Sequence, residues 1–113
     1  MPGWLRRLGG TVRGGPVLVN TPDTESLVFK VDLRGIQSVS MYVKNIGSNS
    51  AVIRITSSVG GIEYDEVVEN VILAGDVYKL VLFGVYDDVR VYARSATAGS
   101  PTTLKIAWVG VRA

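Results

Sequence analysis

The sequence predicts an all-β fold, an antiparallel β-sandwich that is jelly-roll-like, with about eight strands and a flexible N-terminal arm. The 113 residues include nineteen valines and seven isoleucines, whose branched side chains suit the pleated surface of a strand. Several segments alternate apolar and polar side chains with a period of two, which places one face of each strand against a core. Turn-forming residues separate these segments at intervals of about ten residues, as in sandwiches and barrels. No segment shows convincing helical periodicity.

The predicted strands follow one another along the chain with Gly, Pro, Asn or Asp between them. In the segment 89–94, for example, Val89, Val91 and Ala93 alternate with arginine and tyrosine. Gly60 and Gly61 lie between two such segments and predict a two-residue hairpin turn, because glycine accepts positive φ. The predicted strands are 17–20, 27–33, 39–44, 53–58, 62–68, 77–83, 89–94 and 104–109, and the predicted turns are 20–23, 34–35, 45–49, 60–61, 74–76 and 98–101.

A glycine-rich basic arm, residues 1–15, precedes the predicted sandwich domain of residues 16–113. Five of these fifteen residues are glycine, and ordering each of them costs backbone entropy. One interpretation is a frayed terminus. The other is an arm that orders on a partner through apolar anchors and through arginines that meet an acidic surface. The partner-binding residues predicted on that interpretation are Trp4, Leu5, Arg6, Arg7, Leu8 and Arg13.

The net charge of +2 is unevenly distributed. Residues 1–15 carry three arginines and no acid, whereas the rest of the chain carries nine Lys or Arg against ten Asp or Glu. A protein that binds nucleic acid usually spreads basic residues over one face of its fold. The near-neutral body therefore argues against nucleic acid as a partner. No apolar run approaches the roughly 20 residues of a membrane span, so we expect no membrane partner either.

Two predicted strands lack a clean polar face. In the segments 77–83 and 106–111, apolar side chains occupy both sides of the strand. A sandwich strand needs only one apolar face, so the second face needs cover. The cover comes either from a loop or the arm of the same chain, or from a neighbouring subunit. The residues predicted to self-associate are Leu80, Leu82, Phe83, Val109 and Val111.

The sequence contains no Cys and no His, which excludes disulfides, thiolate chemistry and the commonest general base. We therefore predict no catalytic residue, no cofactor and no enzymatic activity. Carboxylates gather at 63–69 and at Asp87 and Asp88, where oxygen ligands could hold Ca²⁺. Because Glu63 and Asp65 fall on one face of a predicted strand, we interpret them as solvated acids and predict no metal site.

Arg90, Tyr92 and Arg94 form a stripe on one face of a predicted strand. Such a stripe can stack bases or sugars, and Tyr42 could extend it across strands. The alternative, which we favour, is cross-strand pairing of these side chains with acids. The candidate acids are Asp32 and Glu63.

Residues 43–109 carry a recurrent pattern: VKNIGSNSAVIRITSS, then an acidic hairpin, then VILAGDVYKLVLFGVYDDVRVYARS, and finally TTLKIAWVG. The pattern resembles small β-sandwich virion structural proteins of tailed phages and related viruses, of the capsid-decoration or head- and tail-accessory type. An Asn-x-Gly-Ser-Asn turn, an Ala-Gly-Asp turn and a Tyr-Asp-x-Val-Arg-Val-x-Ala-x-Ser strand recur in those proteins. Here they are residues 45–49, 74–76 and 86–95.

The resemblance implies a non-enzymatic decoration or stabilising subunit located in the virion. Its partner would be a major capsid protein or another virion protein, gripped by the N-terminal arm. Proteins of this kind commonly form homo-oligomers, and the resemblance favours a trimer. The alternative function is a carbohydrate-binding or adhesion module of the same sandwich class, for which Tyr42 and Tyr92 would supply aromatic contacts.

Overall fold

The alternation in the sequence forms eight antiparallel strands in the computed structural model, which describes residues 10–113. No helix occurs in this part of the chain, as the sequence predicts. The strands are β1 (Thr11–Asn20), β2 (Ser26–Asp32), β3 (Ile36–Asn45), β4 (Ala51–Val59), β5 (Ile62–Ile72), β6 (Val77–Phe83), β7 (Asp88–Ser95) and β8 (Thr103–Arg112).

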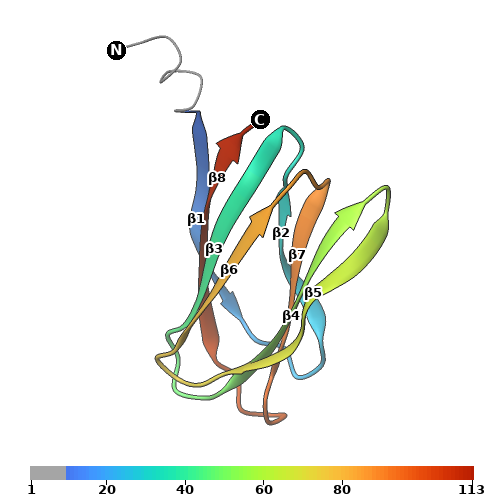
Figure 1. Ribbon diagram of the computed structural model, residues 1–113. Helices are drawn as coiled ribbons and strands as arrows, with labels where there is room; N and C mark the ends of the chain where they lie inside the picture. Colours follow the sequence, from blue (N-terminus) through green and yellow to red (C-terminus); the bar gives the residue numbers. More distant parts are fainter. Residues whose placement is uncertain (1–9) are drawn as a thin grey trace.

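The strands form two four-stranded sheets that pack face to face (Figure 1). The first sheet has the order β1-β8-β3-β6, and the second has the order β2-β7-β4-β5. Consecutive strands lie in different sheets, with the exception of the β4–β5 hairpin. This order is that of a jelly roll, which confirms the predicted fold class.

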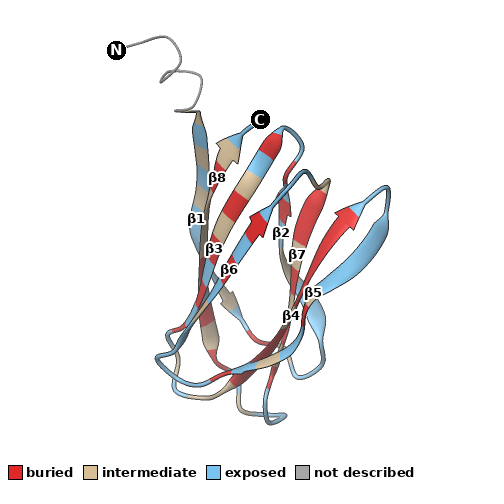
Figure 2. Cartoon of the chain, viewed as in Figure 1, coloured by how far each residue is buried: buried red, intermediate tan, exposed pale blue. Residues whose placement is uncertain are grey.

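The core lies between the two sheets and is built from alternate positions of each strand (Figure 2). Met41 and Val43 of β3 face Val89 and Val91 of β7, and all four have no exposed surface. The buried side chains are mainly Val, Ile and Leu, so the core follows directly from the period-two pattern. The predicted hairpin turn is also confirmed, because Gly60 and Gly61 both have positive φ and Val59 pairs with Ile62.

A buried amide joins the two sheets where several turns meet. The side chain of Asn45, at the end of β3, is fully buried. Its Nδ2 donates to the carbonyl oxygens of Asn49 (2.7 Å) and of Ile72 on β5 (3.0 Å). Its Oδ1 accepts hydrogen bonds from the backbone N–H of Gly47 and from Thr102 Oγ1. All four hydrogen-bonding positions of the amide are therefore used, as burial requires.

The first strand begins earlier than the sequence predicts. Residues 11–14, which we expected in the arm, pair with β8 as part of β1, and the register shifts between Gly14 and Val17. Arg13 therefore lies in a strand, opposite Val109. Glycine is required at position 14, because a Cβ there would overlap the indole ring of Trp108. The glycines that suggested an arm thus include one that allows β1 to lie close to β8.

Strand β6 has two apolar faces, as predicted. Of the β6 residues predicted to self-associate, however, only Phe83 lies on the exposed face. Leu80 and Leu82 point between the sheets and belong to the core. The outer face of β6 carries Val77, Val81 and Phe83 instead. The two leucines are therefore corrected from surface to core residues.

Among residues 10–113 there is no helix with the length and apolarity of a membrane span.

Candidate assembly surfaces

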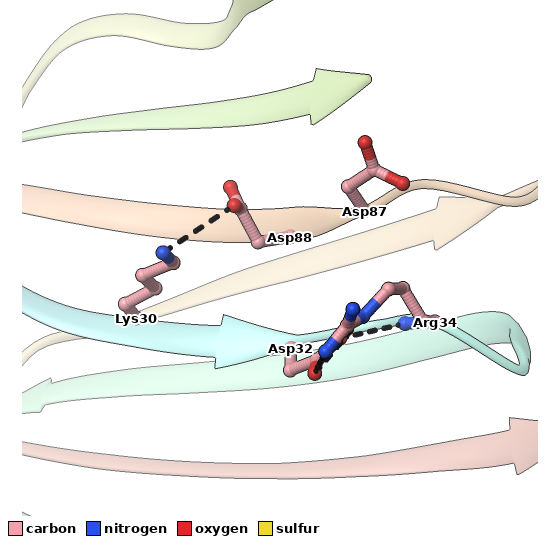
Figure 3. Close-up of a pocket in the computed structure, with 5 residues that line it drawn as sticks. All are labelled: Lys30, Asp32, Arg34, Asp87 and Asp88. Atoms are coloured by element: carbon pink, nitrogen blue, oxygen red, sulfur yellow. Dashed lines mark hydrogen bonds and ion pairs between the residues drawn. The ribbon is translucent and has the colours of Figure 1, made fainter. Parts of the chain in front are cut away.

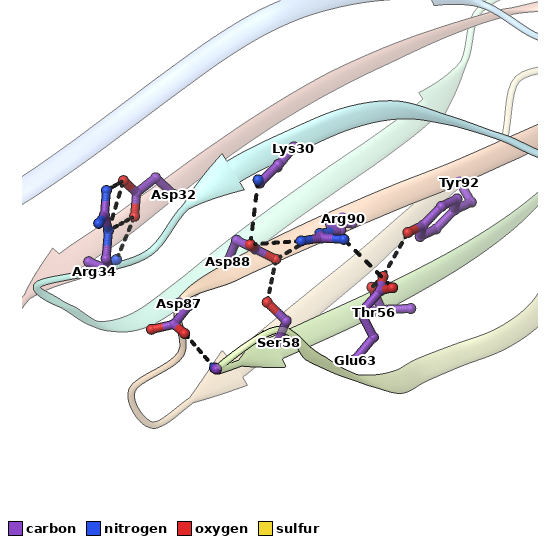
Figure 4. Close-up of polar contacts among 11 residues, drawn as sticks. Lys30, Asp32, Arg34, Thr56, Ser58, Glu63, Asp87, Asp88, Arg90 and Tyr92 are labelled. Atoms are coloured by element: carbon purple, nitrogen blue, oxygen red, sulfur yellow. Dashed lines mark hydrogen bonds and ion pairs between the residues drawn. The ribbon is translucent and has the colours of Figure 1, made fainter.

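The outer face of the second sheet carries a continuous set of paired charges, here termed the paired face (Figure 4). Asp88 is almost buried there and accepts hydrogen bonds from Ser58 Oγ (2.7 Å) and Arg90 Nε (3.1 Å). Lys30 Nζ lies 3.7 Å from Asp88 Oδ2. Burial raises the pKa of Asp88, but the hydrogen bonds from Ser58 and Arg90 outweigh burial and hold it below its ordinary value. Asp88 is therefore a carboxylate near neutral pH.

Glu63 of β5 connects three strands of the paired face. Its Oε1 accepts hydrogen bonds from Tyr92 Oη (2.7 Å) and Thr56 Oγ1 (2.8 Å), while Arg90 Nη1 lies 3.6 Å from its Oε2. The hydrogen bonds from Tyr92 and Thr56 lower the pKa of Glu63. The same contact raises the pKa of Tyr92, because the carboxylate favours the protonated phenol. The side chains of Tyr92 and Arg90 are thus already engaged within the chain.

The rest of the predicted stripe is engaged in the same way. Arg94 Nη2 lies 3.0 Å from Glu69 Oε1. The guanidinium of Arg54 lies over the ring of Tyr92, 4.2 Å from its centroid. Cross-strand pairing with acids is therefore confirmed for Glu63, whereas Asp32 pairs with Arg34 and not with the stripe. Extension of the stripe to Tyr42 is wrong, because β3 belongs to the opposite sheet.

Five charged side chains line an open recess of about 430 Å³ beside the paired face (Figure 3). Arg34 binds both carboxylate oxygens of Asp32, with its Nη2 2.6 Å from Oδ2, and this pair lowers the pKa of Asp32 to about 2. Asp87 accepts a hydrogen bond from a backbone N–H of the β4–β5 turn. Lys30 and Asp88 complete the lining. Each charge here has a partner in the same chain, and residues 10–113 contain no group of three acids placed to hold a metal ion.

The outer face of the first sheet has the opposite character and is here termed the basic face. Its four strands contain no acid. The register places Lys44 of β3 opposite Lys105 of β8, and Lys79 of β6 opposite Tyr42. None of the ion pairs formed within residues 10–113 involves a cation of this face. The cations of the basic face are Arg13, Lys44, Lys79 and Lys105.

Apolar side chains and a shallow recess lie among these cations. Tyr42 is half exposed near the centre of the face, with Lys79 Nζ 5.9 Å from its ring centroid. A recess of about 340 Å³ beside Tyr42 is lined by Arg13, Pro16, Ser40 and neighbouring residues of β8. The basic face therefore combines unpaired positive charge with accessible apolar area.

A third surface, the β5–β6 flank, runs along these two strands and the loops at their ends, and it shares Val77, Val81 and Phe83 of β6 with the basic face. Ten of the fifteen large hydrophobic side chains exposed in residues 10–113 belong to it. Figure 2 shows much of β5 exposed, at one edge of the second sheet, although Val67 and Ile72 belong to the core. An open cleft of about 480 Å³ near the β4–β5 turn is lined in part by Tyr64, Glu66 and Tyr86. The flank consists of Val59, Ile62, Tyr64, Val68, Val71, Leu73, Val77, Val81, Phe83 and Val85.

The structure brings Phe83, Val109 and Val111 to the outer face of the first sheet, where Phe83 and Val111 both pair with Ser38. Phe83 is 78% exposed, and Val109 and Val111 lie half-buried on the basic face. Arg13 also lies on the basic face, in β1. The predicted arm residues Trp4, Leu5, Arg6, Arg7 and Leu8 lie outside the described part of the chain.

Sequence reasoning missed most of the flank on β5. Tyr64, Val68 and Val71 are exposed, although the prediction treated this segment as an ordinary strand with solvated acids. The signal was present in the adjacent apolar pairs 67–68 and 71–72, which place apolar side chains on both sides of one strand. Register shifts in the β4–β5 pairing add to this, because they break the simple alternation.

The chain matches no protein-family model and no curated protein. Its fold is similar to that of solved structures. A chain of the Bacillus endospore appendages, described as disulfide-linked pili, matches with a TM-score of 0.58 and 13% identity, covering 92% of this chain and 90% of that one. PirA matches with a TM-score of 0.53 and 12% identity, over 85% and 92%. The SPBc2 prophage-derived protein YomS matches with a TM-score of 0.52 and 8% identity, over 89% and 94%. At these identities the similarity shows a shared fold over nearly the whole length of each chain.

Proposed function

We propose that the protein is a non-enzymatic structural subunit of a larger assembly, namely a capsid-decoration or stabilising subunit of a virion. The observation that carries this proposal is the β5–β6 flank, where ten large apolar side chains are exposed on two edge strands and the loops at their ends. Exposed apolar surface of this extent is unfavourable in water and marks sites of association. Burial of the flank against neighbours would raise the free energy needed to separate them.

The similarity in fold to a pilus chain and to a prophage-derived protein supports a role in assembly. The endospore appendages are described as disulfide-linked, whereas the present sequence contains no Cys. Contacts between copies of this chain would therefore be non-covalent. Apolar burial and charge complementarity must supply their free energy, which agrees with the exposed flank and the basic face.

Two regions have separate roles in this proposal. Residues 1–9, with Trp4, Leu5 and Leu8 as anchors, attach the subunit to a major capsid protein or another virion protein. Phe83, together with Val109 and Val111, contributes to self-association, with a trimer favoured. Because β1 and β6 form opposite edges of the first sheet, the arm and the β6 part of the flank belong to different edges, and both can act at once.

Co-sedimentation with purified tailed-phage shells that lack their decoration protein, together with light scattering, tests the proposal. We expect the wild-type chain to self-associate and to sediment with the shells. Deletion of residues 2–9 should abolish shell binding but leave the melting temperature unchanged. Phe83→Ser should weaken self-association by about tenfold or more, because an exposed aromatic anchor is lost.

Leu27→Ser is the matched control, since Leu27 is half exposed on β2, away from the flank. It should change neither measurement. A wild-type chain that stays monomeric at high concentration and binds no shell contradicts the proposal. Unfolding of the chain after deletion of residues 2–9 would contradict the role of the arm.

A further inference from the structure

Basic and acidic residues are divided between the two sheets. The strands of the first sheet carry five cations and no acid. Those of the second sheet carry four cations and six acids. The totals for the whole chain nearly cancel and hide this division, which arises because sequence neighbours alternate between the sheets. The sandwich is therefore positive on one side and negative on the other.

Four of the six acids belong to β5, the edge strand of the second sheet. Asp65 and Glu69 each contact an arginine, yet their side chains remain 46% and 63% exposed. Glu66 accepts a hydrogen bond from Ser57 Oγ (2.9 Å) and forms no ion pair within residues 10–113. A carboxylate has room for about four hydrogen bonds, so these groups can accept further donors from a second molecule.

Both charged surfaces also carry exposed apolar side chains. Val68 and Val71 are exposed on β5, which also carries the acids. On the basic face, Tyr42 and Val81 lie among the lysines. The two surfaces thus match in chemistry, since each combines apolar area with charge, and the charges are opposite. An interface with an apolar centre and a charged rim has this composition.

We propose that β5 of one copy docks on the basic face of a second copy, with the β5 carboxylates against Lys79 and Lys105. The proposal rests on the self-association proposed above and names the two surfaces that meet. Opposite charge steers the two copies together and penalises the pairing of like surfaces. Of the paired face, only the β5 edge takes part in the contact, through Asp65 and Glu69, whose side chains stay partly exposed beside Arg54 and Arg94.

Such a contact joins two different surfaces, so every copy keeps one free basic face and one free β5. Repetition of a contact of this type closes into a ring or continues as an open filament, depending on the rotation between copies. A rotation that closes after three copies gives the trimer favoured by the resemblance. The same contact with another rotation gives a polymer.

Complementary charge reversal tests the proposal with two variants of the full chain. The first, Lys79→Glu with Lys105→Glu, makes the basic face acidic. The second, Asp65→Lys with Glu69→Lys, makes β5 basic. Each variant alone should associate at least about tenfold more weakly than the wild type, because like charges then meet in the contact. Sedimentation velocity at about 0.05 M salt, where screening is weak, provides the measurement.

An equimolar mixture of the two variants should regain association, since the acidic face of the first then meets the basic β5 of the second. The control is Lys30→Glu with Arg34→Glu, which changes the net charge equally but lies beside the paired face, and it should associate like the wild type. Wild-type-like association of both variants, or failure of the mixture to associate, overturns the proposal. If the wild type associates but the variants give either of these results, only this proposal fails and the proposed function stands. A monomeric wild type overturns this proposal and the proposed function together.

Discussion

The two outer faces of the sandwich are each formed by four strands, but they differ in whether their charged side chains have ion-pair partners within the described chain. On the paired face, Asp88 and Glu63 each contact two or more partners from other positions of the same sheet. On the basic face, Lys44, Lys79 and Lys105 belong to a sheet whose strands contain no acid. One face is electrostatically complete in the isolated chain. The cations of the other have no ion-pair partner within residues 10–113, which is why we propose it, together with the flank, as an assembly surface.

The largest expected effect comes from breaking the amide that joins the two sheets. Asn45→Ala should lower the free energy of unfolding by about 4 kcal/mol, because four hydrogen bonds are lost and buried groups such as the Ile72 carbonyl lose their partner. Urea unfolding at neutral pH gives the measurement. Asn49→Ala is the control, since Asn49 donates one exposed hydrogen bond, and it should cost about 0.5–1 kcal/mol. Equal losses for the two variants would contradict the role assigned to Asn45.

Lowering the pH should weaken the ion pairs and hydrogen bonds of the paired face, whereas the basic face has no carboxylate in its strands to be protonated. The pKa values of Asp32, Glu63 and Asp88 are lowered by folding, that of Asp32 to about 2, from ordinary values of 3.8 for Asp and 4.5 for Glu. Their stabilisation is therefore present above the ordinary values and is lost as the pH falls through the folded values. The melting temperature should drop between about pH 4.5 and about pH 2.

A variant with Glu63→Gln and Asp88→Asn sharpens this titration. It should melt at a lower temperature than the wild type at pH 7, because charge-assisted hydrogen bonds to Arg90 are lost. Its further decrease on acidification should be shallower, since two of the titrating groups are absent. Parallel curves for variant and wild type would show that the paired face is not the source of the pH dependence.

The smallest expected effect is on the folding of a single chain after removal of a cation from the basic face. Lys79→Ala should change the free energy of unfolding by less than about 0.5 kcal/mol, because Lys79 has no ion-pair partner within residues 10–113 and lies 5.9 Å from the Tyr42 ring. Chemical denaturation at low protein concentration, where association is minimal, gives this value. A loss above about 1 kcal/mol would mean that the basic face is used within the chain.

The strands and turns could be predicted from the sequence because their signals are local. Val89, Val91 and Ala93 alternate with polar neighbours, and Gly60 with Gly61 has few conformational alternatives to a tight turn. The preferred pairing of Arg90 with Glu63 could also be anticipated, since acids and bases at strand positions tend to pair across a sheet. Local periodicity thus predicted the fold class and the charge pairing on the paired face.

The assembly surfaces were less accessible to sequence reasoning. Both faces of β6 are apolar, so alternation alone could not decide whether Leu80 or Val81 points into the core. The start of β1 was missed because Gly14 resembles an arm residue until the Trp108 ring beside it is known. The exposure of β5 depends on its place at the edge of the second sheet, which is a property of strand order.

By itself, the sequence determined a valine-rich jelly roll without cysteine or histidine, because strand period and turn chemistry act between residues a few positions apart. Only the tertiary structure decided that all acids of the strands lie in one sheet and that the other sheet carries cations alone, since each sheet is assembled from strands that alternate along the chain. It also decided which apolar residues stay outside, because that choice depends on pairing between strands that are distant in sequence.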